Sequence, residues 1–419
     1  MAAGPIVFSM GMVKMFNFFL PEFRQNPYSF CQRLRESDPV HWGISFEPGI
    51  AGMWHIARYS DILQILRDQR FTHQAQAGNS AGDASSDFID PLQLYFSLSR
   101  QSLLFADPPA HTRLRALVSR AFTPRMIEGL RPRVEATASA LLQAGQKGGN
   151  LDVVNEYALP LTITIIAEML GVPPEGRAQL TSWAGVLIRA VDCKQSPDIY
   201  ASAAQVAMEI YAYFTELLAH RRQALGPDLL SQLLVAHDQE DRLSEAELIV
   251  TATTLLIAGH ETTVNLIGNG TYALLRHPEQ LTLLRQRPDL MPSAIEEFLR
   301  FEASSQMASR YATEDMQVGG TTIQRGQIVN LLLGSGNRDP EAFSDPDHLN
   351  ITRRENRHLA FGMGIHFCLG APLARLEAQT AIGLLLQNFP GLRLLDAQPL
   401  WRDTIGFRGL QRLDVTWDR

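Results

Sequence analysis

One cysteine near the end of the chain lies in a segment suited to holding a metal ion. Cys368 belongs to FGMGIHFCLG, residues 361–370, in which three glycines flank the cysteine. Glycine lets the backbone approach a bound group closely and lets amide groups turn toward the sulfur. Pro372 opens a predicted helix that runs to about Phe389, since proline is favoured in a first helical turn. The sulfur would then lie at a helix N-terminus, where the dipole and free N–H groups favour a thiolate.

The other cysteines limit the kinds of metal site that are possible. Cys31 and Cys193 are far from Cys368 in the sequence, and no two cysteines form a CxxC pair. A disulfide framework, a four-cysteine zinc site and an iron–sulfur cluster are therefore disfavoured, and a reducing compartment is expected. Axial ligation of a haem iron requires only one thiolate. An inert cysteine in the core is the alternative for any lone cysteine.

A second candidate segment lies in the middle of a long apolar run. Over residues 248–275, Glu261 is the only charged side chain apart from His260, and Ser244 and Glu247 form a capping box ahead of the run. A helix of this length would span roughly 42 Å, enough to cross the molecule. The letters AGHETT at its centre put a glycine and two threonines in the helix interior, where they are poor helix formers. A tolerated irregularity beside a solvated glutamate is the alternative interpretation.

A third candidate is an ion pair within one short predicted helix. Pro292 and Ser293 begin this helix, and Glu297 and Arg300 are i, i+3 neighbours on one face of it. A surface salt bridge of little energetic value is the usual outcome of this spacing. Alone, the pair is a weak signal of function.

Most of the chain around these segments is predicted to be helical. Apolar residues recur at helical spacing over residues 124–145, 160–170, 202–225 and 371–389. Strand patterns are few and short, and they cover residues 55–57, a hairpin over 316–323 and a strand over 327–333. We therefore predict a mainly α fold with small β-sheets, of the α+β class.

Composition excludes several classes of protein. The chain has 419 residues, of which 45% are hydrophobic and 19% charged, as in ordinary globular proteins. The net charge of −7 argues against general nucleic-acid binding, which needs a basic surface. Neither residues 5–20 nor the long apolar run suits a bilayer, because the first is short and interrupted and the second holds polar groups. We expect a cytoplasmic enzyme without a membrane anchor, and a mobile loop over residues 74–86.

The three candidate segments together resemble the cytochrome P-450 superfamily of haem-thiolate monooxygenases, specifically its soluble bacterial members. The cysteine segment matches F-G-x-G-x-H-x-C-L-G at every position, Glu297 and Arg300 match E-x-x-R, and AGHETT matches the oxygen-activation motif. The resemblance extends over nearly the whole chain from about Phe16. It implies the cytochrome P-450 fold, a single large domain over residues 16–419 with a long central helix over the haem. Residues 1–15 would form a poorly ordered extension.

The resemblance also implies how the chain would hold haem b, iron protoporphyrin IX. Cys368 would be the proximal ligand of the iron. Four basic side chains would pair with the haem propionates, namely His111, Arg115, Arg310 and His366. Four further residues would line the cofactor, namely Ala258, Gly259, Phe361 and Gly362. Two carboxylates that enter a protein interior need such charged partners.

Two residues of the long helix would take part in the reaction, and the ion pair would be structural. The resemblance implies that Thr262 hydrogen-bonds the oxygen and that Glu261 shuttles protons from solvent. Glu297 and Arg300 would lock the core near the haem, usually together with an arginine from a P-E-R-F segment. Here that segment is PDHL, residues 346–349, so the third partner is either the histidine of this segment or the nearby arginine at position 353.

The implied activity is insertion of one oxygen atom from O2 into a small molecule, by hydroxylation or epoxidation. Secondary metabolites such as polyketides, macrolides and terpenoids are the implied substrates. Substrate contacts are expected from residues 71–105, 183–201, 304–308 and 405–407, and from Ala258. A peroxide-driven haem-thiolate hydroxylase and a non-catalytic haem protein are the alternatives, and the Glu261–Thr262 pair argues against both.

The chain contains no flavin- or nicotinamide-binding domain, so electrons would come from separate partners. The resemblance implies a ferredoxin and a ferredoxin reductase that uses NAD(P)H. Ferredoxins are acidic, so a basic docking face is expected, with Arg113, Arg120 and Arg125 as candidates. The enzyme is expected to be a monomer that binds neither nucleic acid nor membranes.

Overall fold

The computed structural model describes residues 17–46, 50–74, 99–192, 196–235, 237–238 and 241–418. The expected N-terminal extension, Cys193 and all but the first residue of the expected loop over 74–86 lie outside these residues. None of the helices in these residues combines the length and the hydrophobicity that a membrane span requires.

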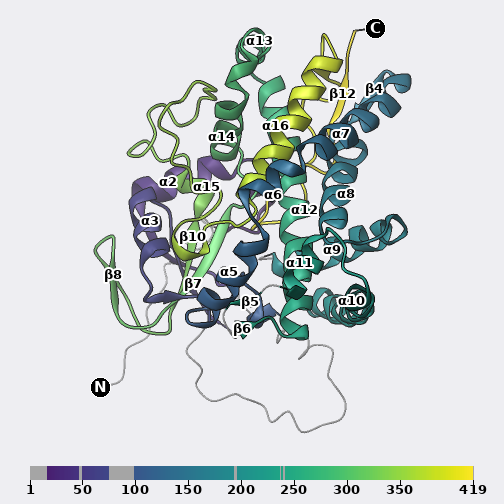
Figure 1. Ribbon diagram of the computed structural model, residues 1–419. Helices are drawn as coiled ribbons and strands as arrows, with labels where there is room; N and C mark the ends of the chain where they lie inside the picture. Colours follow the sequence, from purple (N-terminus) through teal and green to yellow (C-terminus); the bar gives the residue numbers. More distant parts are fainter. Residues whose placement is uncertain are drawn as a thin grey trace, which may run out of the picture.

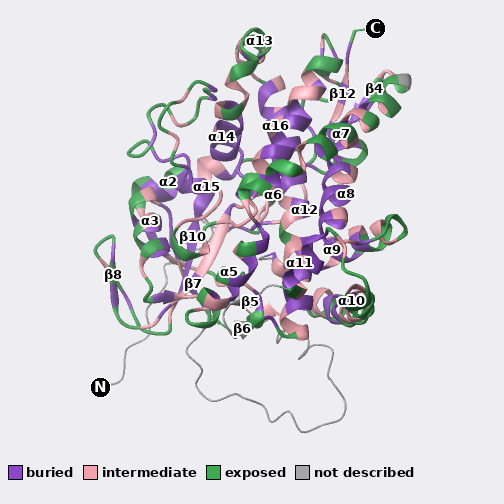
Figure 2. Ribbon diagram, in the orientation of Figure 1, coloured by how far each residue is buried: buried purple, intermediate pink, exposed green. Residues whose placement is uncertain are grey.

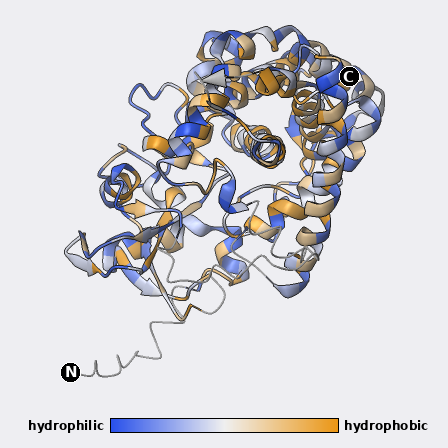
Figure 3. Ribbon diagram, turned by 60° about the horizontal axis from the view of Figure 1, so that its bottom comes forward, coloured by the Kyte–Doolittle hydropathy of each residue, from blue (hydrophilic) through white to orange (hydrophobic). Residues whose placement is uncertain are grey.

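One long helix organises the helical part of the molecule. Helix α12 (Glu245–Leu275) packs against α8 (Leu159–Met169), α9 (Arg177–Val191), α14 (Met291–Phe301) and α16 (Ala371–Asn388). Figure 1 shows these helices gathered on one side of the molecule, with the largest sheet on the other. Apolar and polar stretches alternate along most helices (Figure 3), as amphipathic helices around a shared core do. The buried stretches in Figure 2 accordingly concentrate where these helices meet.

The capping box predicted from the sequence begins α12. The Ser244 hydroxyl accepts a hydrogen bond from the Glu247 N–H at 3.2 Å, and the Glu247 carboxylate accepts one from the Ser244 N–H at 2.8 Å. These two bonds satisfy N–H groups that a helix start otherwise leaves unpaired. The helix continues for 31 residues, so the long central helix is confirmed.

The largest sheet has five strands in the order β1-β2-β10-β7-β3. Its strands are β1 (Val40–Gly43), β2 (Met53–Ile56), β10 (Ile328–Leu332), β7 (Met307–Ala312) and β3 (Phe71–Thr72). The β2–β10 pair is parallel and the other pairs are antiparallel. The short edge strand β3 is thereby placed beside β7, which brings together segments more than two hundred residues apart in the chain.

The remaining elements are mostly short. The other α-helices are α1 (Pro21–Gln25), α2 (Pro27–Ser37), α3 (Tyr59–Arg67), α5 (Ala110–Ala121), α6 (Pro124–Gly129), α7 (Arg131–Gly145), α10 (Pro197–Gln223), α11 (Leu229–Val235), α13 (Pro278–Gln286) and α15 (Leu333–Gly336). A π-helical segment covers Val153–Ala158, and 3₁₀ turns cover Gln146–Gly148, Pro174–Gly176, Pro288–Leu290 and Gly364–His366. The small sheets are formed by β4 (Asn150–Asp152), β5 (His237–Asp238), β6 (Asp241–Arg242), β8 (Met316–Val318), β9 (Thr321–Ile323), β11 (Arg393–Leu394) and β12 (Asp414–Thr416).

The mainly α prediction is confirmed, although one predicted helix is two. The run over residues 124–145 is interrupted at Leu130, between α6 and α7. Pro132 lies in the first turn of α7, because proline has no N–H and its ring clashes with the carbonyl four residues earlier. The apolar periodicity continues across this break, so the break could not be predicted from the periodicity. Helix α10 also begins earlier than predicted, where the Ser196 side chain accepts a bond from the Ile199 N–H.

Candidate functional site

Cys368 lies in a tight loop that leads into helix α16. Its N–H donates to the Phe361 carbonyl at 2.9 Å, which closes the loop on itself. Helix α16 begins at Ala371, and the N–H groups of Gly370 and Ala371 are directed at the Cys368 sulfur. The cysteine is therefore at a helix N-terminus, as the sequence predicted.

Two of the loop glycines are required by the backbone path. Gly362 and Gly364 have φ of 66° and 73°, a region that favours glycine. A Cβ on Gly364 would also lie 2.5 Å from the carbonyl oxygen of Leu66 at the end of α3. The loop is thus pressed against α3, and a side chain at this position would displace the cysteine.

The helix N-terminus is one of several influences on the Cys368 thiol. Burial raises the pKa of the Cys368 thiol, although the Gly370 N–H, the charge of Arg115 and the Ala371 N–H act in the opposite direction. Desolvation disfavours the charged form and outweighs these groups. A metal ion would reverse this balance, because a coordinating thiol loses its proton. Burial raises the pKa of Cys31 to about 11, and that cysteine has the surroundings of an inert core residue.

The four predicted basic residues come together near this loop. His111 and Arg115 are on α5, Arg310 is on β7, and His366 belongs to the cysteine loop. The ring centroids of His111 and His366 are 4.1 Å apart. Burial lowers the pKa of His366 to about 3, and the charges of His111, Arg310 and Arg115 add to this effect. Burial also lowers the pKa of Arg310 to about 10.

A fifth basic residue, His73, belongs to this cluster and was missed from the sequence. Its ring centroid lies 4.3 Å from that of His366 and 5.9 Å from that of Phe105. Burial and the charges of Arg310, His366 and His111 hold the pKa of His73 far below its usual range. His73 directly follows β3, and only the pairing of β3 with β7 brings it near Arg310. We name His73, His111, Arg115, Arg310 and His366 the cationic cluster.

The cationic cluster fits a buried dianion. Both ring nitrogens of His111 and Nε2 of His73 are buried without a hydrogen-bond partner in the part of the chain that the structure describes. The nearby carboxylate of Asp107 accepts bonds from the backbone N–H groups of His73 and Gln74, at 2.9 and 3.0 Å. Buried polar groups normally have partners, and the two arginine cations of the cluster need an anion. Two propionates of a haem would supply both, so the residues present fit this cofactor.

Replacing Arg310 separates a role in cofactor binding from a role in folding. We expect Arg310→Met to stabilise the apoprotein by about 1–3 kcal/mol, because it removes a buried cation that forms no ion pair with any of the described residues. The same change should weaken haem retention at least tenfold. Urea unfolding of the apoprotein and haem transfer to an acceptor protein measure the two effects.

Arg287→Met is the matched control, since Arg287 forms an exposed ion pair with Asp289. It should alter neither quantity appreciably. An Arg310→Met apoprotein that is clearly less stable than the wild type would contradict the assignment of the cationic cluster to an anion.

The middle of α12 presents Ala258 and Thr262 on one face. Ala258 is exposed and Thr262 is partly exposed, whereas Glu261 and Thr263 are buried. Ala258 and Thr262 therefore lie on an accessible face of a helix that is otherwise largely buried. The Thr262 hydroxyl donates to the Ala258 carbonyl at 2.6 Å. Such a bond back to the preceding turn is common for threonine in helices.

Gly259 serves helix packing, and Glu261 has a partner that the sequence did not reveal. A Cβ on Gly259 would lie 3.2 Å from Cδ1 of Ile166 in α8, so glycine allows α12 and α8 to approach closely. The Glu261 side chain forms an ion pair with Arg402, from the C-terminal segment. A carboxylate that is only 6% exposed is thus compensated directly.

The Glu297–Arg300 pair is fully buried, with both side chains at 0% exposure. The two groups form two hydrogen bonds of 2.7 and 2.9 Å. Arg353 is the third member, since its Nε donates to Glu297 at 3.1 Å. The side chain of His348, the other alternative, is exposed and pairs with Asp345, and only the His348 backbone carbonyl accepts a bond from Arg300, at 3.3 Å.

Two of the segments expected to contact substrate lie side by side. Backbone bonds join Gln306 to Gly406 at 2.8 Å and Arg408 to Ser304 at 2.7 Å. Asp192, directly after α9, accepts bonds from the N–H groups of Ile405 and Gly406. The expected regions 304–308, 405–407 and the end of α9 therefore meet. Large parts of the expected segments 71–105 and 183–201 lie outside the described residues or pack in the core.

Comparisons with known proteins show the family of the chain. A family model for cytochrome P450 matches residues 192–287 and 285–392. The biotin biosynthesis cytochrome P450 of Bacillus subtilis (strain 168) is 42% identical over 398 residues, which cover 95% of this chain and 98% of the relative. Cytochrome P450 monooxygenase PikC of Streptomyces venezuelae is 39% identical over 405 residues, covering 95% and 92%.

Solved structures give the same result. The crystal structure of P450BioI in complex with acyl carrier protein ligated to hexadec-9Z-enoic acid matches with a TM-score of 0.88 and 42% identity, over 95% of this chain and 99% of the other. The cytochrome P450 PksS of the Bacillus subtilis 168 bacillaene polyketide synthase matches with a TM-score of 0.87 and 37% identity, over 96% and 100%.

Proposed function

This chain belongs to the cytochrome P450 family of monooxygenases, and from that premise we propose that it hydroxylates or epoxidises a secondary metabolite such as a polyketide, macrolide or terpenoid. The observation that carries the proposal is the joint placement of Cys368 and the cationic cluster. One offers a single thiol at a helix N-terminus, and the other offers two arginine cations beside imidazole nitrogens that have no hydrogen-bond partner in the described residues. Relatives named for macrolide and polyketide biosynthesis support the substrate class.

We propose haem b as the cofactor, held through its iron and through its propionates. Cys368 would ligate the iron, and the cationic cluster would bind the propionates through charge-assisted hydrogen bonds. When bound, the haem supplies oxygen activation, and thiolate ligation favours cleavage of the O–O bond. Ala258 and Phe361 would contact the cofactor. Gly362 would permit the loop geometry, and Gly259 the close packing of α12 and α8.

The residues of α12 would supply protons to the reaction. Thr262 carries a hydroxyl on the open face of the helix, one residue after Glu261. Glu261 is the only carboxylate in the central part of this helix and is compensated by Arg402. We propose that Glu261 takes protons from solvent and that Thr262 passes them to the reacting O2.

Electrons would come from a ferredoxin and its NAD(P)H-dependent reductase in the cytoplasm. Arg120 and Arg125, on α5 and α6, are exposed and suit an acidic partner. Arg113 forms an ion pair with Glu247, so it is the weakest of the three candidates. The exposed apolar side chains of Ile365 and Phe367 beside Cys368 would add contact area.

Thr262→Ala tests the proposed reaction. The variant should still fold, load haem and bind substrate, because a small apolar side chain replaces a hydroxyl on an open face. Electrons from NAD(P)H should then reduce O2 to hydrogen peroxide. The yield of product per NAD(P)H should fall at least about tenfold, because a positioned proton-transfer group typically contributes about 10²–10⁴-fold. The measurement is that ratio, with peroxide assayed in parallel.

Thr263→Ala is the matched control, since it removes the neighbouring hydroxyl from a buried position on the same helix. It should leave the ratio near the wild-type value. Unchanged coupling in Thr262→Ala would refute the proton relay through this hydroxyl.

The substrate is best sought by a spectral-shift screen of natural products. Because one relative was crystallised with a fatty-acyl carrier protein, the screen should include acyl groups on a carrier protein as well as free small molecules.

A further inference from the structure

Asp192 places a buried carboxylate at the point where helix α9 meets the C-terminal segment. It directly follows α9, and only 2% of the residue is exposed. Its carboxylate accepts hydrogen bonds from the backbone N–H groups of Ile405, at 3.1 Å, and of Gly406, at 2.7 Å. Hydrogen bonds to a charged acceptor are stronger than neutral ones, and a buried carboxylate depends on such bonds. Asp192 therefore fixes one point of the C-terminal segment to the end of α9.

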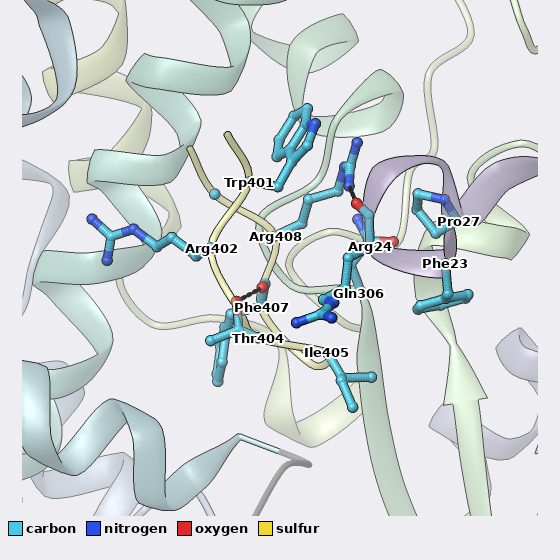
Figure 4. Close-up of a pocket in the computed structure, with 11 residues that line it drawn as sticks. Phe23, Arg24, Pro27, Gln306, Trp401, Arg402, Thr404, Ile405, Phe407 and Arg408 are labelled. Carbon is cyan, nitrogen blue, oxygen red and sulfur yellow. Dashed lines mark hydrogen bonds between the residues drawn. The ribbon is translucent and has the colours of Figure 1, made fainter. Parts of the chain in front are cut away.

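The residues that Asp192 holds belong to a bend over residues 404–407. The Thr404 hydroxyl donates to the Phe407 carbonyl at 2.5 Å, and Figure 4 shows this bond as a dashed line. The Gln306 N–H donates to the Gly406 carbonyl at 2.8 Å, so the bend is also attached to the segment before β7. These hydrogen bonds give the bend its shape and its position.

One side of the bend borders open space. A cavity of about 270 Å³, including space open to solvent, lies between α1 and the bend, and its lining includes Phe23, Arg24, Thr404 and Phe407. Packing against α1 therefore does not fill this side. The bend has room to move toward α1 when its hydrogen bonds are lost.

The bend also lies beside the middle of α12. Before it in the sequence, Arg402 pairs with Glu261, and after it a Cβ on Gly409 would clash with the amide group of Asn265. Both contacts are within one helical turn of Thr262, on the accessible face of the helix. Helix α9 packs against α12 as well, so the carboxylate joins two segments that both contact the central helix.

We infer that Asp192 is a positioning residue that holds the bend 404–407 beside α12 and thereby limits the size of the molecules admitted at Thr262. This inference rests on the proposed haem site and deepens the proposed function, because it concerns which ligands fit there. Without the carboxylate, two buried N–H groups lose their acceptor, and the bend moves into the cavity on its α1 side. The space beside α12 then grows, so bulky ligands gain affinity and small ones do not.

A purely structural role for Asp192 makes a different prediction. In that case the carboxylate only ties the C-terminal segment to α9, and its loss lowers the urea midpoint without changing how the protein ranks ligands by size. Asp192→Ala removes the acceptor, whereas the amide oxygen of Asp192→Asn can still accept one N–H bond. Asp198→Ala is the matched control, since Asp198 is exposed in the first turn of α10.

Azoles that ligate haem iron provide probes of different size. Imidazole is the small probe and ketoconazole the large one, and each is titrated into the holoprotein while the shift of the Soret band is followed. We expect Asp192→Ala to raise the ratio of the imidazole Kd to the ketoconazole Kd about tenfold, the lower end of what one methylene group contributes to selectivity. The imidazole Kd itself should change little. Asp192→Asn should raise the ratio less, and Asp198→Ala should leave it at the wild-type value.

Hydrogen exchange gives a readout that depends neither on ligands nor on activity. The amide hydrogens of Ile405 and Gly406 should exchange about tenfold faster in Asp192→Ala than in the wild type, because local opening no longer breaks a bond to a charged group. Asp198→Ala should leave their exchange unchanged. Unaltered exchange in Asp192→Ala would show that the carboxylate does not hold the bend in solution and would overturn the inference.

Thr404→Val keeps the test decisive if Asp192→Ala does not fold. It removes another hydrogen bond of the same bend without changing Asp192, so it should shift the azole ratio in the same direction. A ratio that stays at the wild-type value in both Asp192→Asn and Thr404→Val would then overturn the inference.

The inference and the proposed function fail in distinguishable ways. If exchange at residues 405 and 406 accelerates in Asp192→Ala but the azole ratio does not change, Asp192 has a structural role only, and the proposed haem site stands. If neither azole shifts the Soret band of the wild type, the proposed haem site is wrong, and the inference falls with it.

Discussion

Glu297→Ala is expected to yield little folded, haem-loaded protein. Glu297 and Arg300 have no solvent exposure, and Arg353 joins them from a distant loop. Removing the carboxylate leaves two arginine side chains without their shared anion. Breaking a buried pair in this way costs about 3–5 kcal/mol. That is comparable to the whole stability of many proteins, about 5–15 kcal/mol.

The chain offers a control with the same spacing on its surface. Glu128 and Arg131 are also i, i+3 neighbours, and their side chains are 64% and 40% exposed. Glu128→Ala should therefore leave the free energy of unfolding almost unchanged. Soluble yield, haem content and urea unfolding of both variants give the comparison. Equal behaviour of the two variants would show that the buried network does not hold the fold together.

Features coded by neighbouring residues could be predicted from the sequence. The capping box of α12, the helix start after Cys368 and the Glu297–Arg300 pair all depend on spacings of three or four residues. Such spacings fix the relative positions of two side chains, because the helical repeat is regular. The order of the three motifs then identified the family.

Features that depend on distant contacts could not be predicted in this way. Arg402 and Glu261 are 141 residues apart, and no local pattern marks them as partners. His73 reaches the cationic cluster only through the register of β3 on β7. The choice of Arg353 over His348 likewise depends on how the loop after β10 folds back onto α14. In each case the pairing follows from the assembled fold.

The direction in which the pKa of Cys368 is shifted could also not be predicted from the sequence. A helix N-terminus lowers the pKa of a thiol, and this part of the expectation holds for the Gly370 and Ala371 N–H groups. Burial has the larger effect, and burial is a property of the packed molecule. A bound metal ion would act against burial, because a coordinating thiol loses its proton.

Cys368→Ser is expected to abolish the haem-thiolate character of the protein. A serine oxygen does not replace the thiolate, which gives the iron its distinctive electron density. The variant should lose the thiolate spectrum and turn over substrate at least a hundredfold more slowly. Cys31→Ser should retain both, because Cys31 is buried in a separate part of the core. Cys193→Ser, at a position outside the described residues, is expected to retain both as well.

The absorption spectrum of the reduced protein with carbon monoxide tests the central claim most directly. We predict a strongly red-shifted Soret band in the wild type, in Cys31→Ser and in Cys193→Ser, and its absence in Cys368→Ser. A wild-type band at the position typical of histidine-ligated haem would contradict the claim that Cys368 is the axial ligand. A red-shifted band that survives in Cys368→Ser would contradict it equally.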